Sequence, residues 1–335
     1  MLIKQQRLQG ATEEKLKQLK EKMNEHIMYI TKDRQMYRQR ADTSIKQPFL
    51  KMSVITDKSG AFQLPQHHPM PKEWANINLL QASFVGFINH GLNKKELVFF
   101  KETDYVADSD FYISLLFHHL KESLLSIKAE NRPQTLYLQV DNSAAEGKNQ
   151  YLLQFAALLV QNDWFEEVYI HYLQPRHTHK DIDRLFQPFH TFFQWKVIET
   201  MDQAIDFAKS IYQKDVHIHE LKWPILAWKK WFLNFCPALS GHKNKYGFWL
   251  KRGLDGTPML LYKQNSLDEL WAEVEEPVFS TIPNGQPQLI PPNPIPKELI
   301  STIISKAAKF LSTKVSKLEM NLTNITVRDW NITSP

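Results

Sequence analysis

The sequence predicts an α/β protein with a mixed five-stranded sheet and helices on its faces. From residue 49 to residue 205 the patterns run strand, strand, strand, helix, strand, helix, strand, helix. A Gly-Leu-Asn-Lys turn joins the second and third strands and favours antiparallel pairing, whereas alternation of strands with helices favours parallel crossovers. With 335 residues, of which 43% are hydrophobic, the chain can bury a substantial core.

The elements of this core follow in order. Residues 12–40 predict a Glu- and Lys-rich helix, and 51–57 (KMSVITD) a strand that ends in Asp57. ASFVGFINH and KELVFF form the next two strands, and helical spacing of apolar residues predicts a helix over 108–128. TLYLQVDN is a fourth strand that leads into Asp141. An apolar helix (KNQYLLQFAALLVQN), a fifth strand (EVYIHYL) and a helix that begins near HKDID complete the core.

The regions around the core divide the rest of the chain. Residues 1–48 form a basic helical N-terminal region, 49–205 the α/β core with its five strands, and 206–280 a basic and aromatic α+β extension. In the extension we expect a helix after Pro224, a hairpin around Asp255-Gly256 and a short acidic helix at LDELWAEVEEP. Residues 281–296 are a Pro-rich linker, and 297–335 an amphipathic helix with a tail.

The charge distribution points to nucleic acid. Residues 1–47 carry 11 Lys and Arg against 6 Asp and Glu, and residues 222–252 carry 7 Lys and Arg with no acid. Aromatic rings are interleaved in the second stretch, so its rings either stack on bases or form a helical core with a solvated basic face. The cations expected to contact DNA phosphates are Lys229, Lys230, Lys243, Lys245, Lys251 and Arg252.

The order of strands and helices matches the ribonuclease H-like fold, which is shared by ribonucleases H, retroviral integrases and DDE transposases. Such enzymes hold two Mg²⁺ ions with acids on the first strand, at the end of the fourth strand and near the last helix. On this template Asp57 is the first acid, Asp141 the second, and Asp183 or Asp181 the third. Each aspartate alone could equally be a turn or cap residue, so the ordered set is the stronger signal.

The stretch LQPRHTHKDID adds two histidines beside these acids. His177 and His179 are two residues apart, but zinc sites usually need further Cys or His ligands and no cysteine is near. A zinc hydrolase built on this pair is therefore a weaker hypothesis. His177 is better placed to contact the scissile phosphate or to assist proton transfer, unless it only hydrogen-bonds within its loop.

The stretch LYLQVDNSAAEGKNQYLLQFAALLVQNDWFEEVYIHYLQPRHTHKDIDRLF resembles a domain family of uncharacterised function that is abundant in transposon-rich genomes. That family is similar to the catalytic core of a DDE transposase and has Asp-Asn-Cys and Gly-His-Thr-His-Glu-Asp-Ile-Asp motifs. The resemblance covers roughly residues 20–290, and SVITDKSGAFQLP corresponds to the segment with the first acid. It implies that Asp57, Asp141 and Asp183 bind metal with His177 close by, and it favours Asp183 over Asp181.

The chain departs from the family pattern at informative places. Arg176 replaces a glycine, Ser143 a cysteine, and Lys58 follows the first acid. The leading hypothesis is metal-dependent cleavage or strand transfer of DNA with Mg²⁺ or Mn²⁺. The departures favour the alternative, a catalytically inactive, transposon-derived protein that binds DNA or acts as a scaffold.

The expected setting follows from composition. A single cysteine, Cys236, excludes an intramolecular disulfide, and neither a signal peptide nor a long apolar run is visible. We therefore expect an intracellular protein, in the nucleus, without a membrane partner. DNA is the expected partner, and the chain could also form a homo-oligomer.

Overall fold

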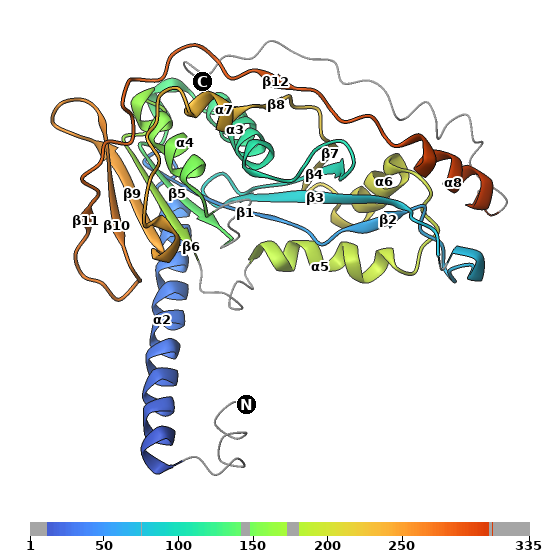
Figure 1. The fold of residues 1–335 in the computed structure, drawn as a ribbon, viewed down its shortest axis with the longest axis horizontal. Coiled ribbons are helices and arrows are strands. Elements are labelled where there is room, and N and C mark those ends of the chain that lie inside the picture. Colours follow the sequence, from blue (N-terminus) through green and yellow to red (C-terminus); the bar gives the residue numbers. More distant parts are fainter. Residues whose placement is uncertain (1–11, 75, 142–147, 173–180, 308–309, 311–335) are drawn as a thin grey trace.

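A mixed ten-stranded sheet forms the centre of the protein (Figure 1). The computed structural model describes residues 12–74, 76–141, 148–172, 181–307 and 310. The predicted α/β class, with one mixed sheet and helices on its faces, is confirmed. None of the helices in these ranges has the length and apolar composition needed to cross a bilayer.

Five strands form the middle of the sheet in the order β4-β3-β1-β5-β6. β1 pairs antiparallel with β3, and β3 antiparallel with β4, whereas β1 and β5, and β5 and β6, are parallel. These are the five predicted strands: β1 Lys51–Lys58, β3 Leu80–Asn89, β4 Lys94–Lys101, β5 Thr135–Val140 and β6 Glu167–Tyr172.

The sheet is larger than predicted because both of its edges are extended. The predicted hairpin, β9 (Gly247–Arg252) and β10 (Pro258–Lys263), pairs through β9 with β6. β7 (His217–Glu220) adds in parallel to β4, and the three-residue β2 (Phe62–Leu64) pairs with β3. Without β9 and β7, β6 and β4 would be edge strands, whose free N–H and C=O groups favour such additions. β2 instead lies beside β3, an inner strand of the sheet.

Two predicted features of the extension differ from the structure. The acidic helix expected at LDELWAEVEEP is wrong, because Ala272–Glu273 form strand β11, which is hydrogen-bonded to β10. The Pro-rich linker contains β12 (Leu289–Ile290), which pairs with β8 (Ile225–Leu226). β11 pairs with the strand just before it in the chain, whereas β12 pairs with a strand more than 60 residues away.

Helices cover both faces of the sheet (Figure 1). α3 (Ser109–Leu125), α4 (Gln150–Gln161) and the short α7 (Trp228–Phe232) pack on one face. α5 (Asp181–Phe193) and α6 (Met201–Tyr212) pack on the other. The C-terminal half of α2 (Glu13–Lys46) also contacts this second face, whereas its N-terminal half projects away from the sheet. α8 (Lys297–Ala307) packs near the 3₁₀ helix Lys72–Trp74.

The aromatic residues of the 222–252 stretch resolve the alternative that the sequence left open. Trp223, Trp228, Trp231, Phe232 and Phe248 are all buried in the core on the α3 side. Their rings are therefore unavailable for stacking on bases, and the core explanation is correct for them.

Gly86 on β3 marks the point where α5 comes closest to the sheet. A Cβ atom at this position would lie 2.8 Å from Phe186 Cζ and 2.9 Å from Ile182 Cδ1, both on α5. We expect Gly86→Val to lower the free energy of unfolding by about 1–3 kcal/mol, because extra volume in a packed core strains its neighbours. Gly60, which has open space around its Cα, provides the control as Gly60→Ala, and urea unfolding measures both. Equal stability of the two variants would contradict this close approach.

Candidate active site

Two of the predicted acids lie at the carboxyl ends of neighbouring parallel strands. Asp57 is near the end of β1, and Asp141 directly follows β5. Ile55 of β1 pairs with Gln139 of β5, and each aspartate lies two residues further along its own strand direction, so Asp57 and Asp141 lie side by side. Ile55 packs on the α5 side, and strand side chains alternate between faces, so the pattern places both acids on the α5 face.

The third acid is carried by α5, which crosses this same region. Ile182 and Phe186 of α5 lie over Gly86, and Gly86 pairs with Asp57 across β1 and β3. Asp183 follows Ile182 in the first turn of the helix and is partly exposed. The first, second and third acids of the prediction thus belong to adjoining elements on one face of the sheet.

Asp181, the alternative third acid, is occupied by other contacts. The Tyr37 hydroxyl donates to its Oδ2 over 3.1 Å, and His90 Nε2 lies 3.6 Å from the same oxygen. Hydrogen bonding to His90, and then to Tyr37, lowers the pKa of Asp181, against the opposing effect of burial. This carboxylate thus links α2, α5 and the end of β3.

Lys58 follows the first acid but is directed to another partner. Its Nζ lies 2.8 Å from Glu102 Oε1, and that oxygen also accepts a hydrogen bond from Ser83 over 2.6 Å. The lysine charge is thereby balanced by a carboxylate other than Asp57. The remaining site residues of the sequence prediction, His177 with the neighbouring His179 and Arg176, lie outside the described residues, as does Ser143.

Lys148 is a residue at this edge that the sequence prediction missed. Its Nζ lies 3.9 Å from the centre of the Tyr246 ring and 5.4 Å from that of Tyr172, the last residue of β6. Burial lowers the pKa of Lys148 to about 8. The lysine is therefore a buried amine near the strand end that precedes α5. The sequence feature that could have indicated this lysine is the Glu-Gly-Lys-Asn segment, residues 146–149, just before α4.

The predicted DNA-binding cations do not form one surface. Lys243 and Lys245 precede β9 and lie at the end of β6 that contains Tyr172, whereas Lys251 pairs with Glu167 at the opposite end, roughly 20 Å away. Arg252 donates to Val160 O over 2.7 Å and contacts Asp163 at the end of α4. Lys229 forms ion pairs with Asp108 and Asp110, and Lys230 is an exposed neighbour on α7. Lys243 and Lys245 thus remain the cations nearest the acidic edge.

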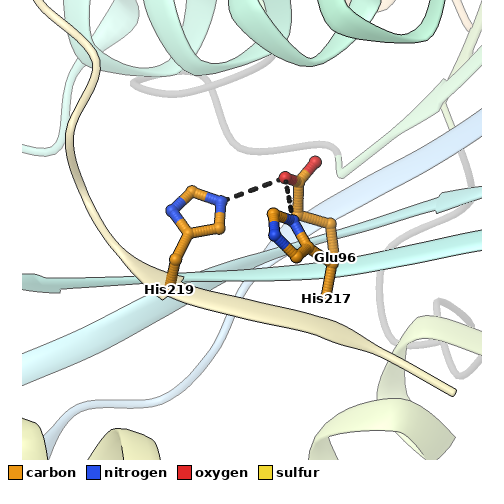
Figure 2. Close-up of side chains that lie close together, drawn as sticks. All are labelled: Glu96, His217 and His219. Atoms are coloured by element: carbon orange, nitrogen blue, oxygen red, sulfur yellow. Dashed lines mark hydrogen bonds and ion pairs between the residues drawn. The ribbon is translucent and has the colours of Figure 1, made fainter. Parts of the chain in front are cut away.

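A second cluster lies on the other face of the sheet, around Glu96 (Figure 2). Glu96 on β4 is completely buried, and its Oε1 lies 3.2 Å from His217 Nδ1 and 3.0 Å from His219 Nε2. Both histidines come from β7, where alternate residues point to the same side. In the described part of the chain, these three side chains are the group whose potential metal-ligand atoms all lie within 4.8 Å of one another.

His119 of α3 holds the other oxygen of this carboxylate. Its Nδ1 lies 2.6 Å from Glu96 Oε2, and its ring stacks on Phe87 with centroids 4.4 Å apart. Contacts with the three histidines hold the pKa of Glu96 well below its usual range, although burial alone would raise it. The hydrogen bond to Glu96 in turn raises the pKa of His217. The cluster therefore keeps a full negative charge in the interior.

The fold defines an α/β protein with one mixed sheet between two layers of helices. Residues 72–268 match the family model described as a domain of unknown function, DUF7869. The match covers more than half of the chain, so the protein belongs to this family. Neither a curated protein nor a solved structure matches the sequence.

Proposed function

We propose that the protein is a transposase-like enzyme that cleaves or transfers DNA strands with a ribonuclease H-like core. The observation that carries this proposal is the order β4-β3-β1-β5-β6 with its strand directions, combined with the positions of three acids. Asp57 lies near the end of β1 and Asp141 directly follows β5, the two parallel strands at its centre, and Asp183 lies in the first turn of the helix beside them. This order, with acids at these positions, supports the proposal because it resembles the arrangement in which ribonuclease H-like enzymes hold their metal ions.

The residues present fit Mg²⁺ or Mn²⁺. Carboxylate oxygens are hard ligands of the kind that these ions prefer. When bound, such ions activate the attacking oxygen and stabilise the leaving oxygen of a phosphodiester. Asp57, Asp141 and Asp183 would hold them, while Lys243 and Lys245 would neutralise phosphates of the DNA backbone. His177 would contact the scissile phosphate or assist the proton transfer.

A nicking assay tests this proposal. Supercoiled plasmid DNA is incubated with purified protein and Mg²⁺, Mn²⁺ or EDTA, and open-circular product is measured. We expect nicking with either metal and none with EDTA. If the protein binds DNA but leaves it intact with both metals, the enzymatic proposal fails.

The second candidate function is DNA binding without cleavage, in the nucleus and as a monomer or homo-oligomer. The observation that favours it is that Lys243 and Lys245, the predicted cations nearest the acidic edge, could bind a phosphate backbone without catalysis. On this alternative the protein would be a transposon-derived binding or scaffold protein.

The salt dependence of DNA affinity identifies the cations that contact phosphates. We expect Lys243→Ala to reduce the slope of log K against log salt by about one, because one phosphate contact is lost. Arg252→Ala should leave the slope unchanged, since its guanidinium is already bonded to Val160 O and Asp163. Fluorescence anisotropy at several salt concentrations measures both. If instead Arg252→Ala reduced the slope and Lys243→Ala left it unchanged, the DNA would contact the end of β9 that contains Arg252.

A further inference from the structure

We propose that Glu96, His217 and His219 form a binding site for a divalent transition metal ion, Zn²⁺ by preference. The site is separate from the acidic edge. Glu96 pairs with Phe87 of β3, and Phe87 pairs with Thr56 of β1. Glu96 is therefore two strand spacings, about 10 Å, from Thr56, the residue before Asp57. Glu96 faces α3, whereas the acids belong to the α5 face.

The hydrogen bonds of His219 provide the main argument. Its Nδ1 lies 2.8 Å from the backbone oxygen of Glu220, and a carbonyl oxygen can only accept, so Nδ1 carries the proton. In a neutral ring, Nε2 then presents a lone pair to Glu96 Oε1 at 3.0 Å. Two lone pairs repel at this distance unless a cation lies between them.

The surroundings match what a metal-binding histidine requires. Such histidines usually donate their second ring N–H to a carbonyl or carboxylate, and His219 does so to Glu220. His119 similarly orients the carboxylate through Oε2, which leaves Oε1 for the ion. Its own Nε2 is buried without a hydrogen-bond partner, which agrees with a neutral ring protonated on Nδ1.

The ligand spacing also fits the size of the ion. Zinc bonds to nitrogen and oxygen of about 2.0–2.1 Å place tetrahedral ligand atoms about 3.3 Å apart. Oε1 lies 3.0 Å and 3.2 Å from the two histidine nitrogens. The side chain of His217 is 60% exposed, so water can supply the fourth ligand. Imidazole nitrogens favour Zn²⁺ and related transition ions over Mg²⁺.

The ion would attach an edge strand to the core. β7 has four residues and pairs in the sheet with β4 alone among the described strands. Glu96 belongs to β4, and both histidines belong to β7, so the ion bridges the two strands. We therefore expect Zn²⁺ to raise the melting temperature of the metal-free protein.

Calorimetric titration of the full-length, metal-free protein with ZnCl₂ tests the proposal. We expect the wild type to bind one Zn²⁺ ion with high affinity. Loss of an outer-shell partner of a metal site lowers affinity by roughly 10–100-fold, so loss of the direct ligand in His217→Ala should lower it by at least as much. His217 is mostly exposed, so this variant should fold normally, as circular dichroism will verify. His68→Ala removes an exposed histidine elsewhere and should bind Zn²⁺ as the wild type does.

The alternative is that a proton, and not a metal ion, lies between each histidine nitrogen and Glu96 Oε1. The rings of His217 and His219 would then be doubly protonated. Absence of Zn²⁺ binding in the wild type, or the same affinity in His217→Ala, would overturn the proposal. ¹⁵N NMR of the histidine rings adds an independent readout. A zinc-dependent shift of His219 Nε2 supports the site, whereas protons on both nitrogens in the presence of Zn²⁺ contradict it.

Discussion

Replacing Asp141 by alanine should reduce metal-dependent DNA nicking by at least about 100-fold. Loss of even an outer-shell partner of a metal site costs 10–100-fold in affinity or activity, and Asp141 is proposed to touch the ions directly. The residue is partly exposed and follows β5 without belonging to it, so the fold should tolerate the change. The rate of plasmid nicking under saturating Mn²⁺ measures the effect.

The control for this experiment is Asp206→Asn, which removes an exposed carboxylate from α6. Its ion pair with Lys209 is on the surface, so neither stability nor nicking should change noticeably. Thermal unfolding of both variants shows whether they remain folded. Nicking by Asp141→Ala at the wild-type rate would remove this residue from the metal site.

Replacing Phe189 by alanine should lower the free energy of unfolding by about 3–5 kcal/mol. Phe189 is fully buried on α5, and its ring centroid lies 5.2 Å from those of Phe62 and Phe84 and 5.5 Å from that of Phe99. These rings attach α5 to the sheet. Since a typical domain is stable by only 5–15 kcal/mol, the loss is a large part of the total.

Phe192 gives a matched control on the same helix. Its side chain is 53% exposed, so Phe192→Ala should change stability by no more than about 0.5 kcal/mol. Urea unfolding monitored by circular dichroism compares the two variants. Similar losses would mean that α5 is not held by the ring cluster, and the position of Asp183 would lose its support.

The sequence predicted the five central strands because their signals are local. Each has a run of β-branched and aromatic residues, and short turns or helices separate them. The positions of Asp57 and Asp141 at strand ends followed from the same runs. The preference for Asp183 over Asp181 came from the family resemblance. The contacts of Asp181 with Tyr37 and His90 could not be predicted, because both residues lie more than 90 residues away in the chain.

The Glu96 cluster was missed for a similar reason. His217 and His219 have a spacing typical of one strand face, but no acid follows them closely in the sequence except Glu220, whereas Asp181 and Asp183 follow the same pattern at His177 and His179. Glu96 is more than 100 residues from both of its β7 partners, and only the parallel pairing of β4 with β7 brings them together. A single sequence contains no signal for that pairing.

The basic and aromatic stretch shows the limit of composition. Its cations were predicted as one DNA surface, but β9 separates Lys245 from Lys251, and Lys229 is neutralised by Asp108 and Asp110. Three of its four tryptophans, Trp223, Trp228 and Trp231, are buried. Composition reports which residues are present, whereas pairing determines which of them reach the same surface.

Anomalous diffraction from crystals grown with Mn²⁺ and a DNA oligonucleotide tests the central claim most directly. The account predicts two manganese peaks about 3.5–4 Å apart, held by Asp57, Asp141 and Asp183 beside a backbone phosphate. DNA bound at this edge with no manganese between the three carboxylates would contradict it and leave the DNA-binding alternative.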